Sequence, residues 1–215
     1  MNGEDISMTD ADRRIFFIDF FGNRVTTTVT STPSVLRKWI RSTWYFRRFY
    51  RTRLIVGLGV QWNPDFDSCS DNPAATLQLC VGCHCIIFQL SHANYVPRLL
   101  VRFLSDPTTT FVGIWNSSDS DKLFWSRHHL VVKPPLDLRF HAASVMGRTD
   151  LENASMEALA SEILGWEGLK KDRFISLSRW DAFELSYDQV HYACADAHVS
   201  FEIGKKLRAW EDFDF

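Results

Sequence analysis

A tyrosine and an aspartate near the C-terminal end have the types and the spacing that could do chemistry. Tyr192 and Asp196 stand four residues apart in LSYDQVHYACADAHVSFEIGKKL, which places a phenol and a carboxylate on one face of a helix. The apolar stripe of the same helix follows a different line, through Val190, Cys194, Ala197 and Phe201. The pair therefore predicts two side chains that share a cleft and do not belong to the main buried face.

Two further segments bear on that cleft. Asp119 follows a strand-like run, FVGIW, and begins a short helix that we expect to extend to Ser126. The run LIVGLGVQW has the branched apolar composition of a buried strand. Its residues Gly59 and Gln61 point to the same face of that strand, because side chains alternate along a strand.

The elements that would position these residues can be predicted from local patterns. Two hairpins are expected, RIFFIDF with RVTTTVT around Gly22-Asn23, and TLQLCV with HCIIFQL around Gly82-Cys83. Helical spacing appears within residues 35–44 and 95–103, and a short strand is expected within LVVKPPLDL. Two further helices are expected. One covers residues 155–164 and ends before Gly165, and the other extends from the capping box Ser186–Gln189 to about residue 207. This order predicts a mixed α/β sheet covered by helices on both faces.

The length and composition place these elements in one domain. The chain has 215 residues, 46% of them hydrophobic, and a formal net charge of -2, so any contact with nucleic acid must come from a local patch. We expect a disordered N-terminus over residues 1–13, a domain over residues 14–208 and an acidic tail over residues 209–215. The polar start and the absence of a long apolar run predict an intracellular protein, in the nucleus or the cytoplasm, with no membrane contact.

The five cysteines do not predict a disulfide framework, because their number is odd and the expected compartment is reducing. Three of them lie in CVGCHC, yet a structural zinc site needs four ligands and no second pair follows at a suitable spacing. We therefore interpret them as thiols on a hairpin. The seven histidines show no ligand spacing either, and no role is assigned to them.

The strongly basic segment lies between residues 37 and 53, where seven Arg or Lys residues alternate with aromatic residues and no acid occurs. This composition suits phosphate contacts and base stacking, and it equally suits an amphipathic helix whose aromatic residues pack on the sheet. The candidates for contact with nucleic acid are Arg47, Arg48 and Arg51, together with Trp62, which either stacks on a terminal base or belongs to the core. The run Arg179 to Asp181 is interpreted as a structural ion pair in a loop.

The order of six motifs resembles a known family. The motifs are LIVGLGVQW, TLQLCVG, FVGIWNSSDSDKL, MEALASEILG, SRWD and LSYDQVHYACADAHVSFEIGKKL. Together they resemble the DEDDy-type 3′-5′ exonucleases, the group of RNase D and the Werner-syndrome exonuclease domain, with the plant members of the Werner-exonuclease-like type as the nearest likeness. The resemblance extends from about Arg14 to Leu207 and implies a ribonuclease-H-like fold, with a five-stranded mixed sheet flanked by helices.

The resemblance also implies a site in which four carboxylates hold two divalent ions, Mg²⁺ or Mn²⁺, that cleave phosphodiester bonds. Asp196 would ligate the ion on the nucleophile side, Tyr192 would orient the attacking water, and Asp119 would hold the second ion. The family's first motif, Asp-x-Glu, falls on Gly59 and Gln61, so both of its acids are missing here. Asp65 and Asp67 lie beyond Pro64 and are not expected to reach back.

Two functions are compatible with this pattern. The first is an exonuclease-like domain that is inactive or severely impaired, with divalent ions weakly bound or absent, which acts as a module for single-stranded DNA or RNA, for an active homologue or for another protein. The alternative is a working metal-dependent 3′-5′ exonuclease that relies on Asp119, Asp196 and Tyr192. Because each 1.4 kcal/mol is a factor of ten in rate, losing the ions' polarisation predicts a loss on the order of a thousandfold or more.

Overall fold

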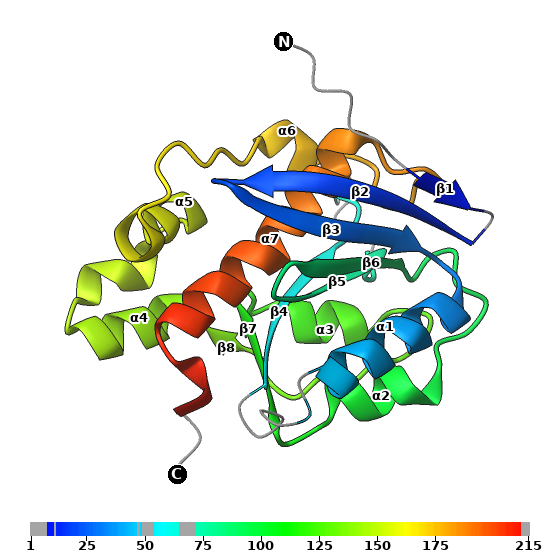
Figure 1. Ribbon diagram of the computed structural model, residues 1–215, viewed down its shortest axis with the longest axis horizontal. Coiled ribbons are helices and arrows are strands. Elements are labelled where there is room, and N and C mark those ends of the chain that lie inside the picture. Colours follow the sequence, from blue (N-terminus) through cyan, green and yellow to red (C-terminus); the bar gives the residue numbers. More distant parts are fainter. Residues whose placement is uncertain (1–7, 11, 47, 49–53, 65–71, 212–215) are drawn as a thin grey trace.

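The structure is a computed structural model, and it describes residues 8–10, 12–46, 48, 54–64 and 72–211. Within these residues the chain forms one mixed sheet of eight strands, flanked by helices on both faces (Figure 1). The strand order is β1-β2-β3-β6-β5-β4-β7-β8. The predicted fold class is therefore confirmed, and the predicted count of five strands is wrong because shorter strands and an N-terminal hairpin extend the sheet.

The N-terminal strands form one edge of the sheet. β1 (Met8–Asp10) pairs with β2 (Arg13–Phe20), which forms a hairpin with β3 (Asn23–Thr30). The two turn residues, Phe21 and Gly22, have φ values of 52° and 80°, as a two-residue hairpin loop of the primed type requires. The hairpin is confirmed, but its turn lies at Phe21 and Gly22 and not at Gly22 and Asn23, because Asn23 already pairs with Phe20. The expectation of disorder over residues 1–13 is wrong for residues 8–10, which pair with β2, and for Arg13, which begins β2.

The central strands carry the predicted meander. β4 (Leu54–Gln61), β5 (Thr76–Val81) and β6 (His84–Gln89) are antiparallel neighbours, and β7 (Thr109–Gly113) and β8 (Leu136–Asp137) follow in parallel beside β4. Alternate residues of β5 and β6 enter two separate hydrophobic clusters, with Leu79 and Ile86 in one and Cys80 and Ile87 in the other. The sheet is thus buried on both sides, which explains the continuous apolar runs in its sequence.

In the part of the chain that the structure describes, three helices cover one face of the sheet, and one long helix covers the other. The amphipathic α1 (Pro33–Phe46) packs through Leu36 and Ile40 with α2 (Arg98–Leu104) and α3 (Asp119–Phe124) in the first cluster. The long α7 (Tyr187–Lys206) lies across the other face and begins with the predicted capping box of Ser186 and Gln189. Its apolar stripe is buried as predicted.

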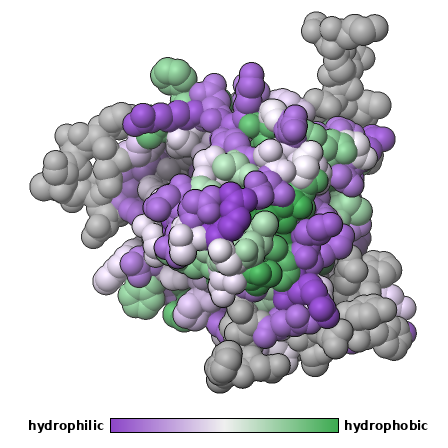
Figure 2. Space-filling view, turned by 90° about the vertical axis from the view of Figure 1, so that its left-hand side faces the viewer, coloured by the Kyte–Doolittle hydropathy of each residue, from purple (hydrophilic) through white to green (hydrophobic). Residues whose placement is uncertain are grey.

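The remaining helices follow β8 along the chain. α4 (Leu138–Met146), a 3₁₀ helix η2 (Thr149–Asn153), α5 (Met156–Leu159), a π-helical segment η3 (Ala160–Leu164) and α6 (Arg173–Ser176) connect β8 to α7. Seen from the side of α4 and α5, the surface is a mosaic of polar and apolar residues (Figure 2). No helix in the described ranges is long and apolar enough to cross a membrane.

The C-terminal boundary lies later than predicted. A short 3₁₀ helix, η4 (Ala209–Glu211), follows α7, and Ala209 is fully buried. Residues 209–211 therefore belong to the folded unit and not to an acidic tail, while residues 212–215 lie outside the described part of the chain.

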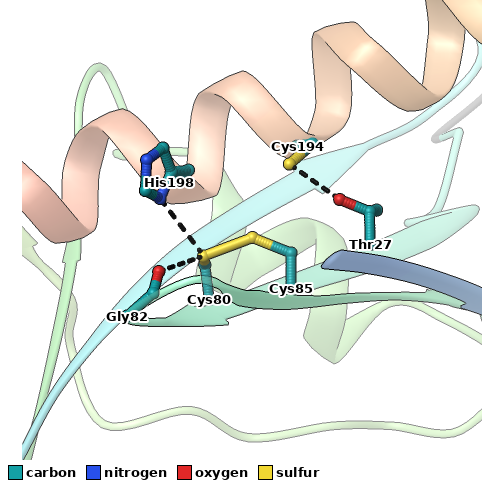
Figure 3. Close-up of a disulfide and its surroundings, with 6 residues drawn as sticks. All are labelled: Thr27, Cys80, Gly82, Cys85, Cys194 and His198. Carbon is teal, nitrogen blue, oxygen red and sulfur yellow. Dashed lines mark hydrogen bonds between the residues drawn. A yellow bond between two sulfur atoms is a disulfide. The ribbon is translucent and has the colours of Figure 1, made fainter. Parts of the chain in front are cut away.

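A disulfide joins Cys80 and Cys85, so the expectation that disulfides are absent is wrong for this hairpin (Figure 3). The two cysteines are directly opposite partners of β5 and β6, a register that cysteine number and compartment do not reveal. Cys194 lies nearby on α7, where the Thr27 hydroxyl donates to its sulfur at 3.0 Å. Burial raises the pKa of Cys194 to about 12, so this residue stays a thiol at neutral pH.

Candidate functional site

The predicted site residues meet in one cavity of about 330 Å³. It opens where β4 ends, beside α7 and the beginning of α3. The cavity is lined among others by Gly59, Gln61, Trp62, Asp119, Lys171, Tyr192 and Asp196. The tertiary structure thus brings together three segments that are far apart in the sequence, and it adds Lys171, which the sequence patterns did not single out.

The geometry of α7 places Tyr192 and Asp196 at the cavity. Both side chains are partly exposed, whereas Ala193 and Ala197 on the adjacent face are buried. Burial and the nearby Asp196 carboxylate raise the pKa of the Tyr192 hydroxyl, so it remains protonated at neutral pH. The i, i+4 spacing therefore presents a neutral phenol and a carboxylate to the same space.

The close approach of β4 to α7 depends on Gly57. A Cβ atom added at Gly57 would lie 1.8 Å from the backbone oxygen of Ala197, closer than any real Cβ contact. Only glycine fits at this position, and this glycine lets the strand lie directly against the helix backbone. The resulting proximity brings the end of β4 within hydrogen-bonding distance of Asp196.

Gly59 has a different environment from Gly57. A Cβ at Gly59 would lie 3.0 Å from Oε1 of Gln78 and 3.3 Å from Cβ of Asp196. Gln78 is the cross-strand partner of Gly59, is fully buried and donates to the Thr76 hydroxyl at 2.6 Å. Its Oε1 has no hydrogen-bond partner within the described part of the chain. The glutamine side chain therefore occupies part of the space that a side chain at position 59 would need.

Gln61 and Lys171 hold the carboxylate of Asp196. The Gln61 amide nitrogen donates to Oδ2 at 2.7 Å, and the Lys171 ammonium forms an ion pair with Oδ1. Burial lowers the pKa of Lys171, but Asp196 and Tyr192 together outweigh this effect and hold that pKa above its usual value. Both oxygens of Asp196 thus have a donor from the protein itself.

Asp119 is the second acid of the cavity and lies at the first residue of α3. Its side chain is buried, and burial together with the Asp196 carboxylate raises its pKa well above the usual range, against the lowering effect of Lys171. A carboxyl group in this position favours its neutral form.

We expect Asp119→Asn to stabilise the protein at neutral pH. The folded pKa of Asp119 lies above the unfolded value, so its contribution to stability is present below that value and is lost as the pH rises through the folded pKa. Asp119→Asn should remove this loss of folding free energy, which amounts to about 1.4 kcal/mol for each unit by which the folded pKa exceeds the unfolded pKa. Urea unfolding between pH 4 and pH 8 measures it, with Asp121→Asn, an exposed acid of the same helix, as the control. Equal pH dependence in Asp119→Asn and the parent would contradict the assignment.

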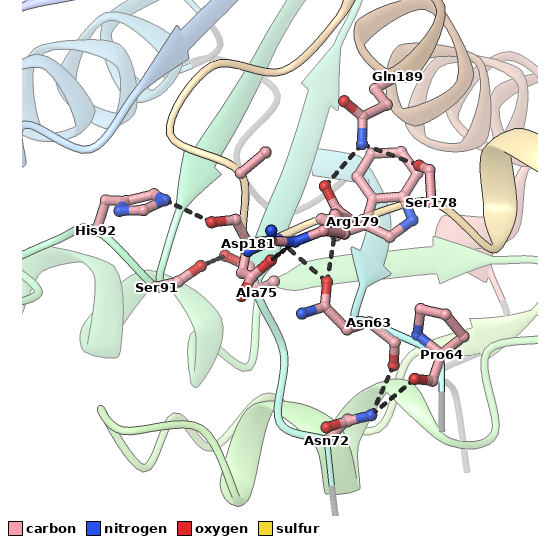
Figure 4. A network of polar contacts seen from close by, with 12 residues as sticks. Asn63, Pro64, Asn72, Ala75, Ser91, His92, Ser178, Arg179, Asp181 and Gln189 are labelled. Carbon is pink, nitrogen blue, oxygen red and sulfur yellow. Dashed lines mark hydrogen bonds and ion pairs between the residues drawn. The ribbon is translucent and has the colours of Figure 1, made fainter. Parts of the chain in front are cut away.

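A polar network fixes the chain just after Trp62 (Figure 4). The side-chain oxygen of Asn63 accepts hydrogen bonds from the backbone nitrogens of Trp180 at 2.7 Å and Asp181 at 3.2 Å. Asn72 donates to the backbone oxygen of Asn63 at 3.0 Å. The loop between α6 and α7 is therefore tied to the exit of β4, where the cavity opens.

The predicted ion pair of that loop is present but contributes little. Arg179 and Asp181 are 3.4 Å apart, and the Arg179 side chain is 81% exposed, so water screens the pair. Trp180 between them is fully buried and donates its ring nitrogen to the Ser176 oxygen at 3.1 Å. The tryptophan and Asn63, more than the ion pair, hold the loop.

The aromatic and basic candidates are only partly placed. Trp62 lines the cavity, and the Lys122 ammonium lies 5.3 Å from the centre of its ring. Arg48 is exposed and does not line the cavity. Arg47 and Arg51 lie outside the described residues, as do Asp65 and Asp67. That Arg47 and Arg51 contact nucleic acid, and that Asp65 and Asp67 do not reach back to the site, therefore stay predictions.

The residues present do not fit a pair of divalent ions. Among the described residues, two carboxylates line the cavity where two ions would require about four, and β4 contributes none. Both oxygens of Asp196 already accept protein donors, and no cluster of three or more His, Cys, Asp or Glu residues in the described part of the chain could hold a metal ion. We therefore assign no chemical step to bound metal.

Comparisons with known proteins agree with the fold. Residues 65–210 match the sequence model of a family described as 3′-5′ exonuclease. A 3′-5′ exonuclease of Arabidopsis thaliana is 31% identical over 159 residues, which are 73% of this chain and 54% of that protein. The bifunctional 3′-5′ exonuclease/ATP-dependent helicase WRN of Mus musculus is 28% identical over 162 residues, 71% of this chain and 11% of that protein.

Among solved structures, the Escherichia coli RNase D, described as an exoribonuclease involved in structured RNA processing, aligns with a TM-score of 0.64. The alignment covers 90% of this chain and 45% of RNase D at 19% sequence identity, so it shows the fold alone. It confirms the ribonuclease-H-like fold. The chain spans about half of the Arabidopsis relative and a smaller share of mouse WRN.

Proposed function

The chain belongs to the 3′-5′ exonuclease family, and on this premise we propose that it is a catalytically inactive or severely impaired member that binds single-stranded nucleic acid. One observation carries the proposal. The strand that would supply the first two acids, β4, instead presents Gly59 and Gln61 to the cavity. An active homologue or another protein is the other kind of partner that such a module would take.

The chemistry of residues 59 and 61 supports the loss of activity. Glycine supplies no ligand, and the amide of Gln61 is neutral and donates to Asp196 instead of accepting a cation. Without ions there is no Lewis acid to activate water or to stabilise the leaving oxygen, and Tyr192 has no bound nucleophile to orient. The expected loss in rate is on the order of a thousandfold or more.

The side chains around the cavity support binding to nucleic acid. Trp62 offers a flat ring with the Lys122 ammonium 5.3 Å from its centre, and the exposed Trp115 also lines the cavity. Aromatic faces next to cations are suited to bases and phosphates of single strands. Elsewhere, α1 exposes Arg37, Lys38 and Arg41.

A trimming assay tests the proposal directly. A 5′-labelled single-stranded oligonucleotide, DNA and RNA in turn, is incubated with the protein in Mg²⁺ and then in Mn²⁺. We expect no shortening beyond the level of a protein-free control. Trimming that requires the metal and disappears in Asp196→Ala would overturn the proposal and favour a working exonuclease that uses Asp119, Asp196 and Tyr192.

Binding is expected to persist in EDTA and to weaken steeply with salt, because released counterions drive phosphate contacts. The variant Arg37→Glu/Lys38→Glu/Arg41→Glu should reduce the magnitude of the slope of log affinity against log salt concentration by about two units. Each phosphate contact to a single strand contributes about 0.7 to this slope, and the variant removes three candidate contacts. Fluorescence anisotropy measures the slope. The matched control changes Lys205 and Lys206 of α7 to Glu, and a slope equal to the parent's in the α1 variant would exclude this helix from the interface.

A further inference from the structure

The ammonium group of Lys171 occupies the cavity as a cation that belongs to the chain. Lys171 lies just before α6, the short helix that Asp172 caps by accepting from the Phe174 nitrogen at 2.8 Å. From there its side chain enters the cavity, pairs with Oδ1 of Asp196 and lies 4.3 Å from the centre of the Tyr192 ring. The Lys171 and Asp196 side chains are only 21% and 13% exposed, so water screens this ion pair far less than a surface pair.

Gln61 completes the coordination of Asp196. Its amide nitrogen donates to Oδ2, the oxygen that Lys171 does not hold. A glutamate at position 61 could accept only, and it would repel Asp196. Glutamine at position 61 therefore donates a hydrogen bond to Asp196, which a glutamate would repel. A lysine and a glutamine that are 110 residues apart in the chain together satisfy one carboxylate.

We propose that Lys171, supported by Gln61, is a tethered cation that takes the place of a divalent ion at Asp196, so that the cavity is stable without metal and excludes it. The inference rests on the proposed function. A partly buried carboxylate without a partner is strongly destabilising, and the chain that lacks the metal ligands of β4 needs another positive charge beside Asp196. A divalent ion would have to displace the ammonium from Oδ1 or the amide from Oδ2, or share one of these oxygens with its protein donor.

Titration with Mn²⁺ of the full chain and its variants tests the proposal. Lys171→Met removes the charge and keeps much of the length of the side chain, and Lys170→Met is the matched control because Lys170 is the exposed neighbour. The parent and Lys170→Met should show no calorimetric binding of Mn²⁺ and the same melting temperature in Mn²⁺ and in EDTA. Lys171→Met should melt at a lower temperature in EDTA, regain stability in Mn²⁺ and show calorimetric binding of Mn²⁺.

Two further variants keep the test decisive if Lys171→Met folds poorly. Lys171→Arg retains the positive charge and should behave as the parent. Lys171→Met/Asp196→Asn removes both charges of the pair, so it should fold and show no response to Mn²⁺. A gain of Mn²⁺ affinity in Lys171→Arg, or a response to Mn²⁺ in the double variant, would overturn the assignment of the tethered charge.

The outcomes separate this inference from the proposed function. If Lys171→Met and Lys170→Met have the same stability and neither binds Mn²⁺, the tethered cation is wrong, whereas the absence of nuclease activity stands. If the parent itself binds two Mn²⁺ ions and trims an oligonucleotide, both are wrong. If the parent binds Mn²⁺ without trimming, only the exclusion of metal by Lys171 is wrong.

Discussion

A variant that carries Gly59→Asp, Gln61→Glu and Gln78→Ala is expected to trim a single strand from its 3′ end in Mn²⁺ at least about a thousandfold faster than the parent chain. The first two substitutions return two carboxylates to the face of β4 that looks toward Asp196. Four acids would then surround the cavity, and their added charge outweighs the single ammonium group that pairs with Asp196.

The third substitution is needed because the space beside Gly59 is occupied. The first side-chain atom at position 59 would already be 3.0 Å from Oε1 of Gln78, a buried group in the neighbouring strand. Truncating Gln78 to alanine removes that contact. We therefore expect the double variant Gly59→Asp/Gln61→Glu to recover less activity than the triple variant, since its new aspartate must displace the glutamine.

The assay is the trimming of a labelled oligonucleotide, with Mn²⁺ binding measured on the same samples by calorimetry. Adding Asp196→Asn to the triple variant should abolish trimming and also the binding of the more tightly held Mn²⁺ ion. A folded triple variant that binds Mn²⁺ but does not trim would show that the cleft differs from an active one in more than the acids of β4.

The variant Gly57→Ala is expected to unfold the protein or to destabilise it by more than about 3 kcal/mol. A methyl group there would lie 1.8 Å from the backbone oxygen of Ala197 and 2.9 Å from the backbone nitrogen of Phe201. Neither β4 nor α7 can move aside easily, because β4 is paired on both sides and α7 is packed along its length. The clash must separate the strand from the helix, and with them Gln61 from Asp196.

Urea unfolding followed by circular dichroism measures this effect. Gly204→Ala in α7 is the control. A methyl group at this position would meet side-chain atoms, of which the nearest belongs to Val112 at 3.1 Å, and the substitution gains about 1 kcal/mol of helix propensity. We expect that control to stay within about 1 kcal/mol of the parent. A Gly57→Ala protein as stable as the parent would contradict the close approach of β4 to α7.

Local patterns predicted most of the elements correctly. The hairpin of β2 and β3, the meander of β4 to β6 and the capping box at Ser186 each depend on residues a few positions apart, where turn chemistry and periodicity act directly. The short strand β1 and the helix α4 were missed, whereas β8 lies within LVVKPPLDL, where a short strand was expected. A strand of two or three residues has no periodicity to read, and it exists only because a neighbouring strand offers its backbone groups.

The disulfide shows the same limit at the level of side chains. The sequence placed three cysteines on a hairpin, but the pairing of Cys80 with Cys85 follows from the register of β5 on β6. Register depends on the packing of both faces of the sheet and not on cysteine number. The prediction therefore found the hairpin and missed its bond.

For the site, the amino-acid sequence by itself determined that residues 59 and 61 bring no carboxylate to the cavity, because they are glycine and glutamine wherever the strand lies. Only the tertiary structure decided which groups lie beside Asp196. The donation from Gln61 to Asp196 joins residues 135 positions apart, and Lys171 reaches the same carboxylate from a loop without any periodic signal. Local propensity acts over about one helical turn, whereas Gln61 and Asp196 meet because Gly57 lets a strand and a helix pack backbone against backbone.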